Sequence, residues 1–401
     1  MDPGLRRGDS LRVGQIVILT TIQFLLLIPV IGGSVFSLLC LWAARRFFLR
    51  PVSTQVSFTP PVTILKPIYG LDKGLEENLR SFCVQDYPDL QVVISVQRTD
   101  DPALPIIHKL AAEFPARVTV VIKPSEPVVN GKVQNLVNGL TAAKHDILII
   151  SDSDVRAKPT YVRDIVTPLH DPSVGYVCSL YRSCKADSWF EKLELLSMNA
   201  DFIPSVVFSE EAKAALFCTG ATLAFRRQDL DAVGGMADLG DYLVEDYELG
   251  RRLVRLRRRY VVIPHVVDLL ADYGTFRQWW NHQVYWDQNT WAANPTGFAL
   301  TILTRAVPFA LLFWIVGGFQ VLGLLVFLAA LTLRLATARI FARDYLEDRE
   351  GLAALWLLPL RDFIAFGSWY VALTRRSFVW RGHRFGLTRE GRIVPRDTHA
   401  S

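Results

Sequence analysis

Cysteine is scarce in this 401-residue sequence: there are five, and no two of them lie at the spacing of a metal site. An odd number of cysteines without a disulfide framework indicates a reducing compartment. The basic stretches lack the aromatic residues of a nucleic-acid-binding module, so no nucleic acid is expected as a partner. There is also no internal repeat or low-complexity tract, which excludes a repeat array.

Apolar residues, by contrast, are abundant. They make up 51% of the sequence, and the mean hydropathy of +0.24 is high for a soluble protein. The net charge is +5, and the basic residues cluster near the apolar runs. This pattern is typical of a protein at an inner-leaflet membrane surface, where anionic lipids attract lysine and arginine.

The N-terminal part contains an apolar stretch over residues 13–43, long enough to span a bilayer. Arg45, Arg46 and Arg50 follow it, so the next segment is expected in the cytoplasm. A cleaved signal peptide is the alternative, but the stretch is too long for a typical signal and lacks a clear small-x-small exit. We therefore expect a membrane anchor over residues 1–50.

A linker over residues 51–61 is followed by alternating strand and helix patterns. The predicted strands are residues 62–68, 91–97, 118–122 and 147–151, and the predicted helices are 75–83, 105–114 and 132–143. Alternation at this spacing predicts an α/β domain with a doubly wound, mostly parallel sheet. We place this catalytic domain at residues 62–297.

The stretch at residues 147–155 runs from four apolar residues straight into Asp152 and Asp154. The apolar run predicts a strand buried on both faces, and ligands of such sheets bind at the carboxyl ends of the strands. Side chains at i and i+2 of an extended chain project to the same side, so two carboxylates face one position. A diphosphate held through Mg²⁺ or Mn²⁺ would relieve their repulsion. The alternative is a solvated turn.

Other strand ends carry the complementary groups. Lys66 ends the first strand, Asp100 and Asp101 follow the second, and Lys132 begins the helix before the fourth. Acidic residues and lysines at neighbouring strand ends predict a site for a nucleotide diphosphate.

Six short motifs occur in a characteristic order: LKP at 65–67, VQRTDDP at 96–102, GKVQNL at 131–136, DSD at 152–154, CTG at 218–220 and VEDY at 244–247. Their order resembles the family-2-like glycosyltransferases of the GT-A fold. The resemblance is closest to the ceramide glucosyltransferases of family 21 and their bacterial relatives, including hopanoid glycosyltransferases. It covers about residues 60–290, and more loosely the flanking apolar segments.

The resemblance implies a role for each aspartate. Asp101 is implied to hold the uracil and ribose of the nucleotide sugar. Asp152 is implied at the diphosphate and the metal, with Asp154 completing the metal pair. Asp246 is implied as the catalytic base. Asp101 and Asp246 each have an alternative interpretation as the cap of a following helix.

The expected acceptor side begins at Gly220, where a glycine permits close backbone approach, and includes Glu245. Related enzymes place a Gln/Arg-x-x-Arg-Trp motif near the diphosphate and acceptor; this chain has His282, Tyr285 and Trp286 there, so the arginine is missing. His282, Gln283 or the metal would then have to meet the charge of the leaving group. A purely structural, aromatic interfacial helix is the alternative.

A C-terminal transmembrane region is expected at residues 298–375, followed by a basic cytoplasmic tail at 376–401. Residues 306–333 fit either one tilted span or a hairpin about Gly317 and Gly318, and residues 352–373 fit a span or an interfacial helix. The whole chain is thus expected to be a multi-pass membrane protein with a cytoplasmic catalytic domain, in the inner membrane if the source is bacterial.

The function expected from these features is inverting transfer of a hexose, from UDP-glucose or another UDP-hexose, to a hydroxyl of a membrane lipid such as ceramide or a hopanoid polyol. The expected partners are a nucleotide sugar, a lipid acceptor and the membrane. One alternative is a processive polysaccharide synthase, which usually needs more spans and an intact Gln-x-x-Arg-Trp motif. Another is a non-catalytic membrane adaptor that retains the fold.

Overall fold

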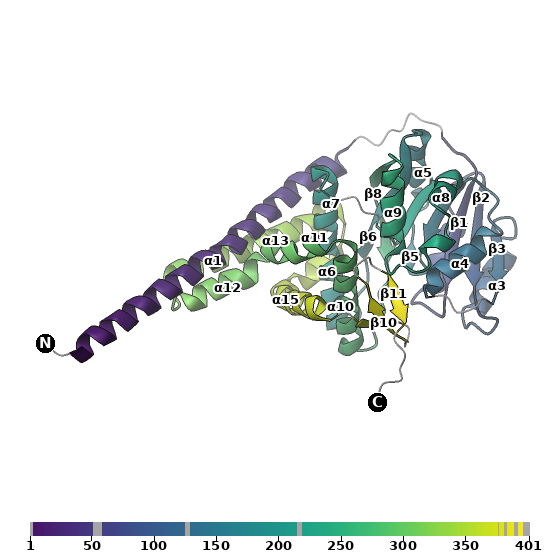
Figure 1. The fold of residues 1–401 in the computed structure, drawn as a ribbon. Coiled ribbons are helices and arrows are strands. Elements are labelled where there is room, and N and C mark those ends of the chain that lie inside the picture. Colours follow the sequence, from purple (N-terminus) through teal and green to yellow (C-terminus); the bar gives the residue numbers. More distant parts are fainter. Residues whose placement is uncertain are drawn as a thin grey trace.

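The computed structural model describes residues 3–50, 58–124, 129–214, 219–375, 377–380, 383–388 and 392–395. Its centre is an eight-stranded sheet (Figure 1). The strands are β1 (Val62–Ile68), β2 (Leu90–Val96), β3 (Val118–Ile122), β4 (Ile147–Ser151), β5 (Val155–Arg156), β6 (Val174–Ser183), β7 (Thr222–Arg226) and β8 (Arg259–Leu269). Their order is β3-β2-β1-β4-β7-β6-β8-β5, and β5 and β7 pair antiparallel with their neighbours. The predicted mostly parallel sheet is confirmed.

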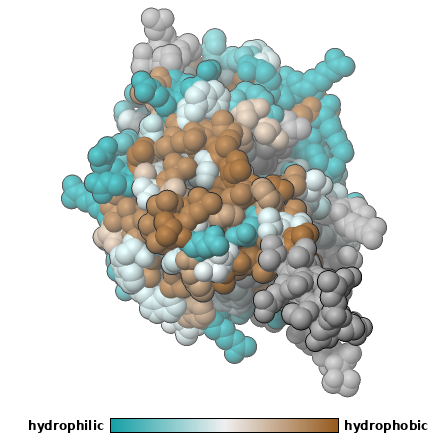
Figure 2. Space-filling model, turned by 90° about the vertical axis from the view of Figure 1, so that its left-hand side faces the viewer, coloured by the Kyte–Doolittle hydropathy of each residue, from teal (hydrophilic) through white to brown (hydrophobic). Residues whose placement is uncertain are grey.

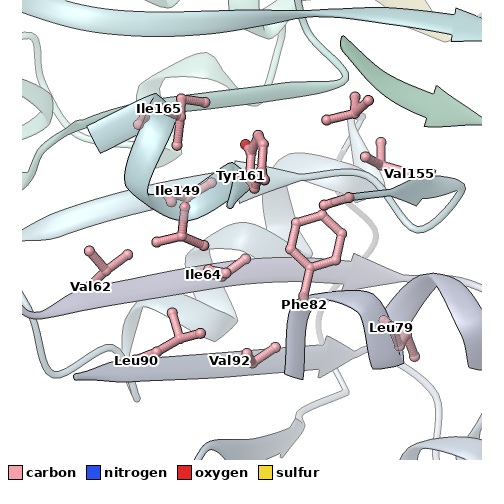
Figure 3. Close-up of a cluster of buried hydrophobic side chains, with 14 of the residues drawn as sticks. Val62, Ile64, Leu79, Phe82, Leu90, Val92, Ile149, Val155, Tyr161 and Ile165 are labelled. Atoms are coloured by element: carbon pink, nitrogen blue, oxygen red, sulfur yellow. The ribbon is translucent and has the colours of Figure 1, made fainter. Parts of the chain in front are cut away.

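Helices cover both faces of this sheet. They are α2 (Leu75–Cys83), α3 (Leu104–Glu113), α4 (Gly131–Leu140), α5 (Tyr161–Val166), α6 (Trp189–Ser197), α7 (Ile203–Ala212), α8 (Arg227–Ala232) and α9 (Glu245–Arg255). Along β1 and β4 the side chains alternate: Ile64 and Ile149 pack against α2, α3 and α5 (Figure 3), whereas Leu65 and Ile150 pack against α4, α8 and α9. Burial on both faces explains why these strands are continuous apolar runs.

The remaining helices form an elongated apolar bundle beside the sheet (Figure 1). They are α1 (Pro3–Phe48), α10 (Phe276–Ala293), α11 (Pro295–Leu300), α12 (Ala306–Val316), α13 (Val321–Ile340), α14 (Arg349–Ala354) and α15 (Leu358–Thr374). A turn through Gly317 and Gly318, the latter at φ +68°, makes α12 and α13 a hairpin rather than one span. A positive φ suits glycine because it has no Cβ.

Three helices in the described part of the chain are long and apolar enough to cross a membrane: Val17–Phe48, Val321–Tyr345 and Arg349–Thr374. The bent pair Pro295–Thr304 and Ala306–Val316, at 53° to each other, makes a fourth if it counts as one span. Large apolar side chains lie exposed on α1, α12, α13 and α15, and Figure 2 shows apolar residues gathered over this end of the molecule. Burial in lipid explains such a surface.

The bundle is packed onto the sheet domain rather than tethered to it. Phe47 of α1 is fully buried in a cluster with Leu180 of β6, Val207 of α7, Val262 of β8 and Phe341. The end of the first membrane helix therefore belongs to the same core as two strands of the sheet.

Part of the expected tail returns to the sheet domain. It forms a small antiparallel sheet of β9 (Ser377–Trp380), β10 (His383–Leu387) and β11 (Ile393–Pro395). The Ile393 amide donates a hydrogen bond to the Asp241 carbonyl at 2.8 Å, and the Ile393 side chain packs near Leu243 and Tyr285. This contact brings the C-terminal part of the chain to the loop that precedes Asp246.

Candidate active site

Lys66 stands at the carboxyl end of β1 and is completely buried. Its ammonium lies 4.0 Å from the Phe82 ring centroid and donates hydrogen bonds to the Ser151 hydroxyl, at 3.2 Å, and to the Asp152 carbonyl. Burial lowers the pKa of Lys66 to about 7, against the attraction of nearby carboxylates. Lys66 thus fixes the backbone after β4, and its direct contact with a nucleotide sugar stays a prediction.

Lys132 pairs with two carboxylates, Asp152 after β4 and Glu245 at the start of α9. Its Nζ lies 2.7 Å from Asp152 Oδ1 and 2.9 Å from Glu245 Oε1. Burial alone would lower the pKa of Lys132, but Asp152 and Glu245 raise it well above its usual value. A permanent positive charge therefore lies between the strand that carries Asp152 and the helix that begins with Glu245.

Asp154 has an oxygen without a partner. Its Oδ1 is shielded from solvent and forms no hydrogen bond in the structure. Burial and the charge of Asp152 raise the pKa of Asp154 to about 7. An uncompensated carboxylate oxygen beside a second carboxylate suits a hard cation such as Mg²⁺ or Mn²⁺.

A cation here would need ligands from its substrate. Among the described residues, no group of three histidine, cysteine, aspartate or glutamate side chains is placed to hold a metal ion. Mg²⁺ is commonly held by one or two carboxylates together with substrate phosphates, so Asp152 and Asp154 fit that mode.

Asp246 is the second residue of α9, and one of its oxygens accepts a hydrogen bond from the Tyr247 amide at 2.8 Å. The other oxygen lies against Gly220, where an added Cβ would collide with it. Burial and the charge of Glu245 raise the pKa of Asp246 to about 7. A carboxyl group that titrates near neutrality is suited to accept a proton.

Asp101 is buried at the end of β2. It accepts hydrogen bonds from the Gly70 amide, at 2.9 and 3.2 Å, and from the Ala103 amide at 2.9 Å. These bonds fix the loop after β1 to the start of α3. Contact of Asp101 with a nucleotide stays a prediction.

The residues expected on the acceptor side lie on α10. The Trp286 indole donates to His282 Nε2 at 2.7 Å, which leaves Nδ1 to donate to the Tyr273 hydroxyl at 2.7 Å. Burial lowers the pKa of His282 to about 4, so the ring is neutral at physiological pH. The Gln283 side-chain amide donates a hydrogen bond to the Glu194 carboxylate. Lys132 thus pairs with the Asp152 carboxylate, and neither His282 nor Gln283 supplies a charge in place of the missing arginine.

Tyr285 lies near the charged groups at the start of α9 and near Lys132. Burial raises the pKa of Tyr285 to about 12, and Glu245, Lys132 and Asp246 act on it electrostatically. The structure therefore brings together Asp152, Lys132, Glu245, Asp246, Gly220 and Tyr285, while Trp286 faces a neighbouring cavity.

Sequence reasoning missed three side chains around this site. Asp72 accepts a hydrogen bond from Ser153 and raises the pKa of Asp154. Burial raises the pKa of Tyr181, and the nearby charges of Asp246, Asp152 and Asp154 raise it further. Glu194 lies beneath His282 and Gln283. A single acid in a loop or on an amphipathic helix carries no signal that would single it out.

The model of glycosyl transferase family 21 matches residues 25–393 of this chain. The chain belongs to glycosyl transferase family 21. This confirms the resemblance and the predicted enzyme class, a hexosyltransferase.

Individual relatives share between about a quarter and a third of their residues with this chain over the matched parts. Ceramide glucosyltransferase 1 of Caenorhabditis elegans is 24% identical over 369 residues, which are 83% of this chain and 73% of that protein. The ceramide glucosyltransferase of Candida albicans is 36% identical over 134 residues, 30% of this chain and 24% of that protein. A solved mannosyltransferase from Pyrobaculum calidifontis, in complex with GDP-Man and Mn²⁺, has a TM-score of 0.52 and 21% identity and covers 88% of this chain and 99% of its own. The structural likeness confirms the GT-A fold.

Proposed function

We propose that this family 21 protein transfers a hexose from a UDP-linked sugar to a hydroxyl of a membrane lipid, with inversion at the anomeric carbon. The observation that carries the proposal is Asp246, a carboxylate with a raised pKa, packed on Gly220 beside the Asp152–Lys132–Glu245 cluster. The names of the relatives, ceramide glucosyltransferases, support a lipid acceptor. The apolar helices support a lipid that stays in the bilayer. Arg45, Arg46 and Arg50, which follow the first of these helices, support a sheet domain on the cytoplasmic side.

In this mechanism the protein orients two substrates and moves one proton. Asp246 accepts the proton of the acceptor hydroxyl as that oxygen attacks the anomeric carbon, and the nucleoside diphosphate leaves from the opposite side. Burial raises the pKa of Asp152, and Lys132 acts against this effect. Lys132 would also place a positive charge beside the departing diphosphate. Glu245 holds Lys132 from the other side and raises the pKa of Asp246.

A divalent cation fits Asp152 and Asp154, because Asp154 Oδ1 is shielded and has no partner. When bound, Mg²⁺ or Mn²⁺ supplies neutralisation of the diphosphate charge. Because the arginine of related enzymes is missing here, the cation and Lys132 have to neutralise a larger share of the diphosphate charge.

Removing the cation is expected to weaken binding of the nucleotide sugar. Excess chelator, or Asp154→Asn, should lower UDP-sugar affinity at least about tenfold, because the diphosphate would lose the charge of the cation and keep only that of Lys132 beside Asp152. Isothermal titration calorimetry with and without Mn²⁺ measures this change. Asp86→Asn is the matched control, since the exposed Asp86 side chain pairs with Arg163 and lies outside the site. Undiminished affinity in chelator would exclude the metal role.

The transfer itself is tested with the full-length protein in lipid vesicles that contain either ceramide or a hopanoid polyol. We expect release of UDP from UDP-glucose and, by mass spectrometry, one hexose added per lipid. A ladder of products would indicate a polysaccharide synthase instead. Absence of UDP release with every UDP-hexose and lipid tried would leave the adaptor as the better interpretation.

A further inference from the structure

Tyr181 stands near the carboxyl end of β6, at the edge of the sheet where the proposed catalytic residues gather. Strand β6 is antiparallel to β7, and β7 is antiparallel to β4, so β6 and β4 run in the same direction. The carboxyl ends of both strands therefore point to the edge that carries Asp152. We propose that the Tyr181 hydroxyl donates a hydrogen bond to a hydroxyl group of the transferred hexose. The inference rests on the proposed function and adds a side chain that recognises the sugar rather than the nucleotide.

On one side, the end of β6 is tied to the segment that contacts Asp246. The Thr219 hydroxyl donates a hydrogen bond to the Ser179 carbonyl at 2.9 Å, and the next residue, Gly220, lies against the Asp246 carboxylate. Ser179 precedes Tyr181 by two residues on a strand that rises about 3.3 Å per residue. Tyr181 is thus a short distance from the proposed base.

On the other side, β8 connects the end of β6 to the expected metal pair. Strand β8 is parallel to β6, with Val267 opposite Tyr181. Leu270, which follows β8, donates its amide to the Asp154 carbonyl at 3.3 Å, and β5, which begins directly after Asp154, pairs with the end of β8. Tyr181 therefore lies between the part of the site that contains the base and the part that would hold the cation.

The Tyr181 side chain is buried without a partner for its hydroxyl. The residue is 3% exposed, and its ring packs against Phe202 with centroids 5.0 Å apart. Among the residues that the structure describes, none forms a hydrogen bond with this hydroxyl. The buried hydroxyls of Tyr87 and Tyr161, by contrast, bond to Pro60 and Thr222. A buried tyrosine hydroxyl usually has a partner, so a bound substrate is a fitting one for Tyr181.

The surrounding charges make this hydroxyl a donor. Burial raises the pKa of Tyr181 well above its usual value, the charges of Asp246, Asp152 and Asp154 raise it further, and Lys132 acts in the opposite direction. The phenol therefore keeps its proton in the physiological range. A hydroxyl group of a sugar has lone pairs that can accept this proton in a hydrogen bond.

The hexose suits this position better than the acceptor hydroxyl does. In the proposed displacement the attacking oxygen and the diphosphate lie on opposite sides of the anomeric carbon, so the sugar ring lies between the base and the cation. Tyr181 occupies the corresponding place in the protein. The acceptor oxygen gives its proton to Asp246 and attacks with a lone pair, and a hydrogen bond donated to that lone pair would weaken the nucleophile.

Tyr181→Phe tests the proposal, because it removes the hydroxyl and keeps the ring against Phe202. Affinity of the full-length protein for UDP-glucose with Mn²⁺ should fall about three- to tenfold, the usual effect of losing one neutral hydrogen bond. Affinity for UDP should stay the same, which also shows that the site is folded. Tyr176→Phe, on the same strand with its ring stacked on Tyr260, is the matched control and should change neither value. Isothermal titration calorimetry measures all four affinities.

Deoxy analogues of UDP-glucose identify the sugar hydroxyl. One of the 2-, 3-, 4- and 6-deoxy analogues should bind the wild type more weakly than UDP-glucose and lose no further affinity in Tyr181→Phe, because the bond is already absent. If Tyr181→Phe weakens UDP as much as UDP-glucose, the hydroxyl contacts the nucleotide or the phosphates and the proposal is wrong. Unchanged affinity for UDP-glucose, or additive losses with every analogue, would also overturn it.

The assignment of Tyr181 and the proposed function fail in different ways. If the wild type glycosylates a lipid and Tyr181→Phe leaves the KM for UDP-glucose unchanged, the assignment is wrong and the proposed function stands. If Tyr181→Phe weakens UDP-glucose but not UDP, and no lipid receives a sugar from the wild type, the assignment stands and the proposed function is wrong.

Discussion

Replacing Asp246 with asparagine is expected to lower kcat by about 10²–10⁴-fold, the usual effect of losing a general base. The substitution keeps the size of the side chain, so it should still fit against Gly220 and accept the Tyr247 hydrogen bond. Affinity for the nucleotide sugar should change only a few-fold, because Lys132, Asp152 and the cation remain. Calorimetry for binding and a single-turnover transfer assay separate the two effects.

Two further variants accompany this test. Asp231→Asn on the exposed side of α8 is the isosteric control and should behave like the wild type. Asp101→Asn should show the opposite emphasis, raising KM more than it lowers kcat. If Asp246→Asn abolishes binding but retains turnover at saturation, Asp246 is a ligand or a cap, and Glu245 becomes the candidate base.

The same residue sets an expected pH dependence. Its pKa is raised to about 7 by burial and by Glu245, so the ionised form needed for proton transfer is lost as pH falls through 7. kcat/KM should therefore stay constant above about pH 7 and fall below it as Asp246 takes up one proton. Glu245→Gln removes the neighbouring charge and should move the acid limb to lower pH. A limb that does not move would show that another group controls it.

Replacing Asp201 is expected to cost about 3–5 kcal/mol of stability, the usual loss when one partner of a buried ion pair is removed. Burial alone would raise the pKa of Asp201, but Arg305, Arg361 and Arg334 hold it well below its usual range. Asp201→Asn would leave Arg334 and Arg361 with Asp362 as their close partner and would remove the carboxylate that pairs with Arg305. Unfolding of the purified protein in detergent, followed by tryptophan fluorescence, measures the loss.

A surface pair provides the matched control. Asp100 pairs with Arg98 on the solvent-exposed surface, so Asp100→Asn should cost less than about 1 kcal/mol. Adding Arg305→Gln to Asp201→Asn removes one of the unpaired charges and should recover part of the stability. An Asp201→Asn protein as stable as the control would mean that water or lipid already compensates these charges.

The sequence predicted those parts of the fold that rest on local patterns. The helix at residues 75–83 has the predicted bounds because Leu75, Leu79 and Phe82 recur at helical spacing. The strand at residues 118–122 also has the predicted bounds. Gly220, expected to permit close backbone approach, lies against Asp246. The Ala221 carbonyl accepts a hydrogen bond from the Asp152 amide, and β7 begins only at Thr222.

Contacts between distant segments could not be predicted in this way. Asp201 lies far along the chain from Arg305, Arg334 and Arg361, and no periodicity links them. A signal did exist: Arg334 interrupts an otherwise apolar helix, and an ionisable residue in such a place usually has a buried partner. Choosing that partner required the packing of α13 against η2 (Met198–Phe202). The neutral state of His282 could not be predicted from the sequence either, because it depends on burial of the ring, which contacts Tyr273 and Trp286.

The position of α1 has a consequence for how the enzyme is made. Helix α1 leaves the ribosome before the sheet, but its contacts include α12 and α13, which are synthesised after the whole eight-stranded sheet. During translation the sheet that carries Asp152 can therefore form before α1 meets α13. We expect an arrested chain that ends before residue 321 to bind UDP already. The packing of the membrane helices would be the last property the growing protein acquires.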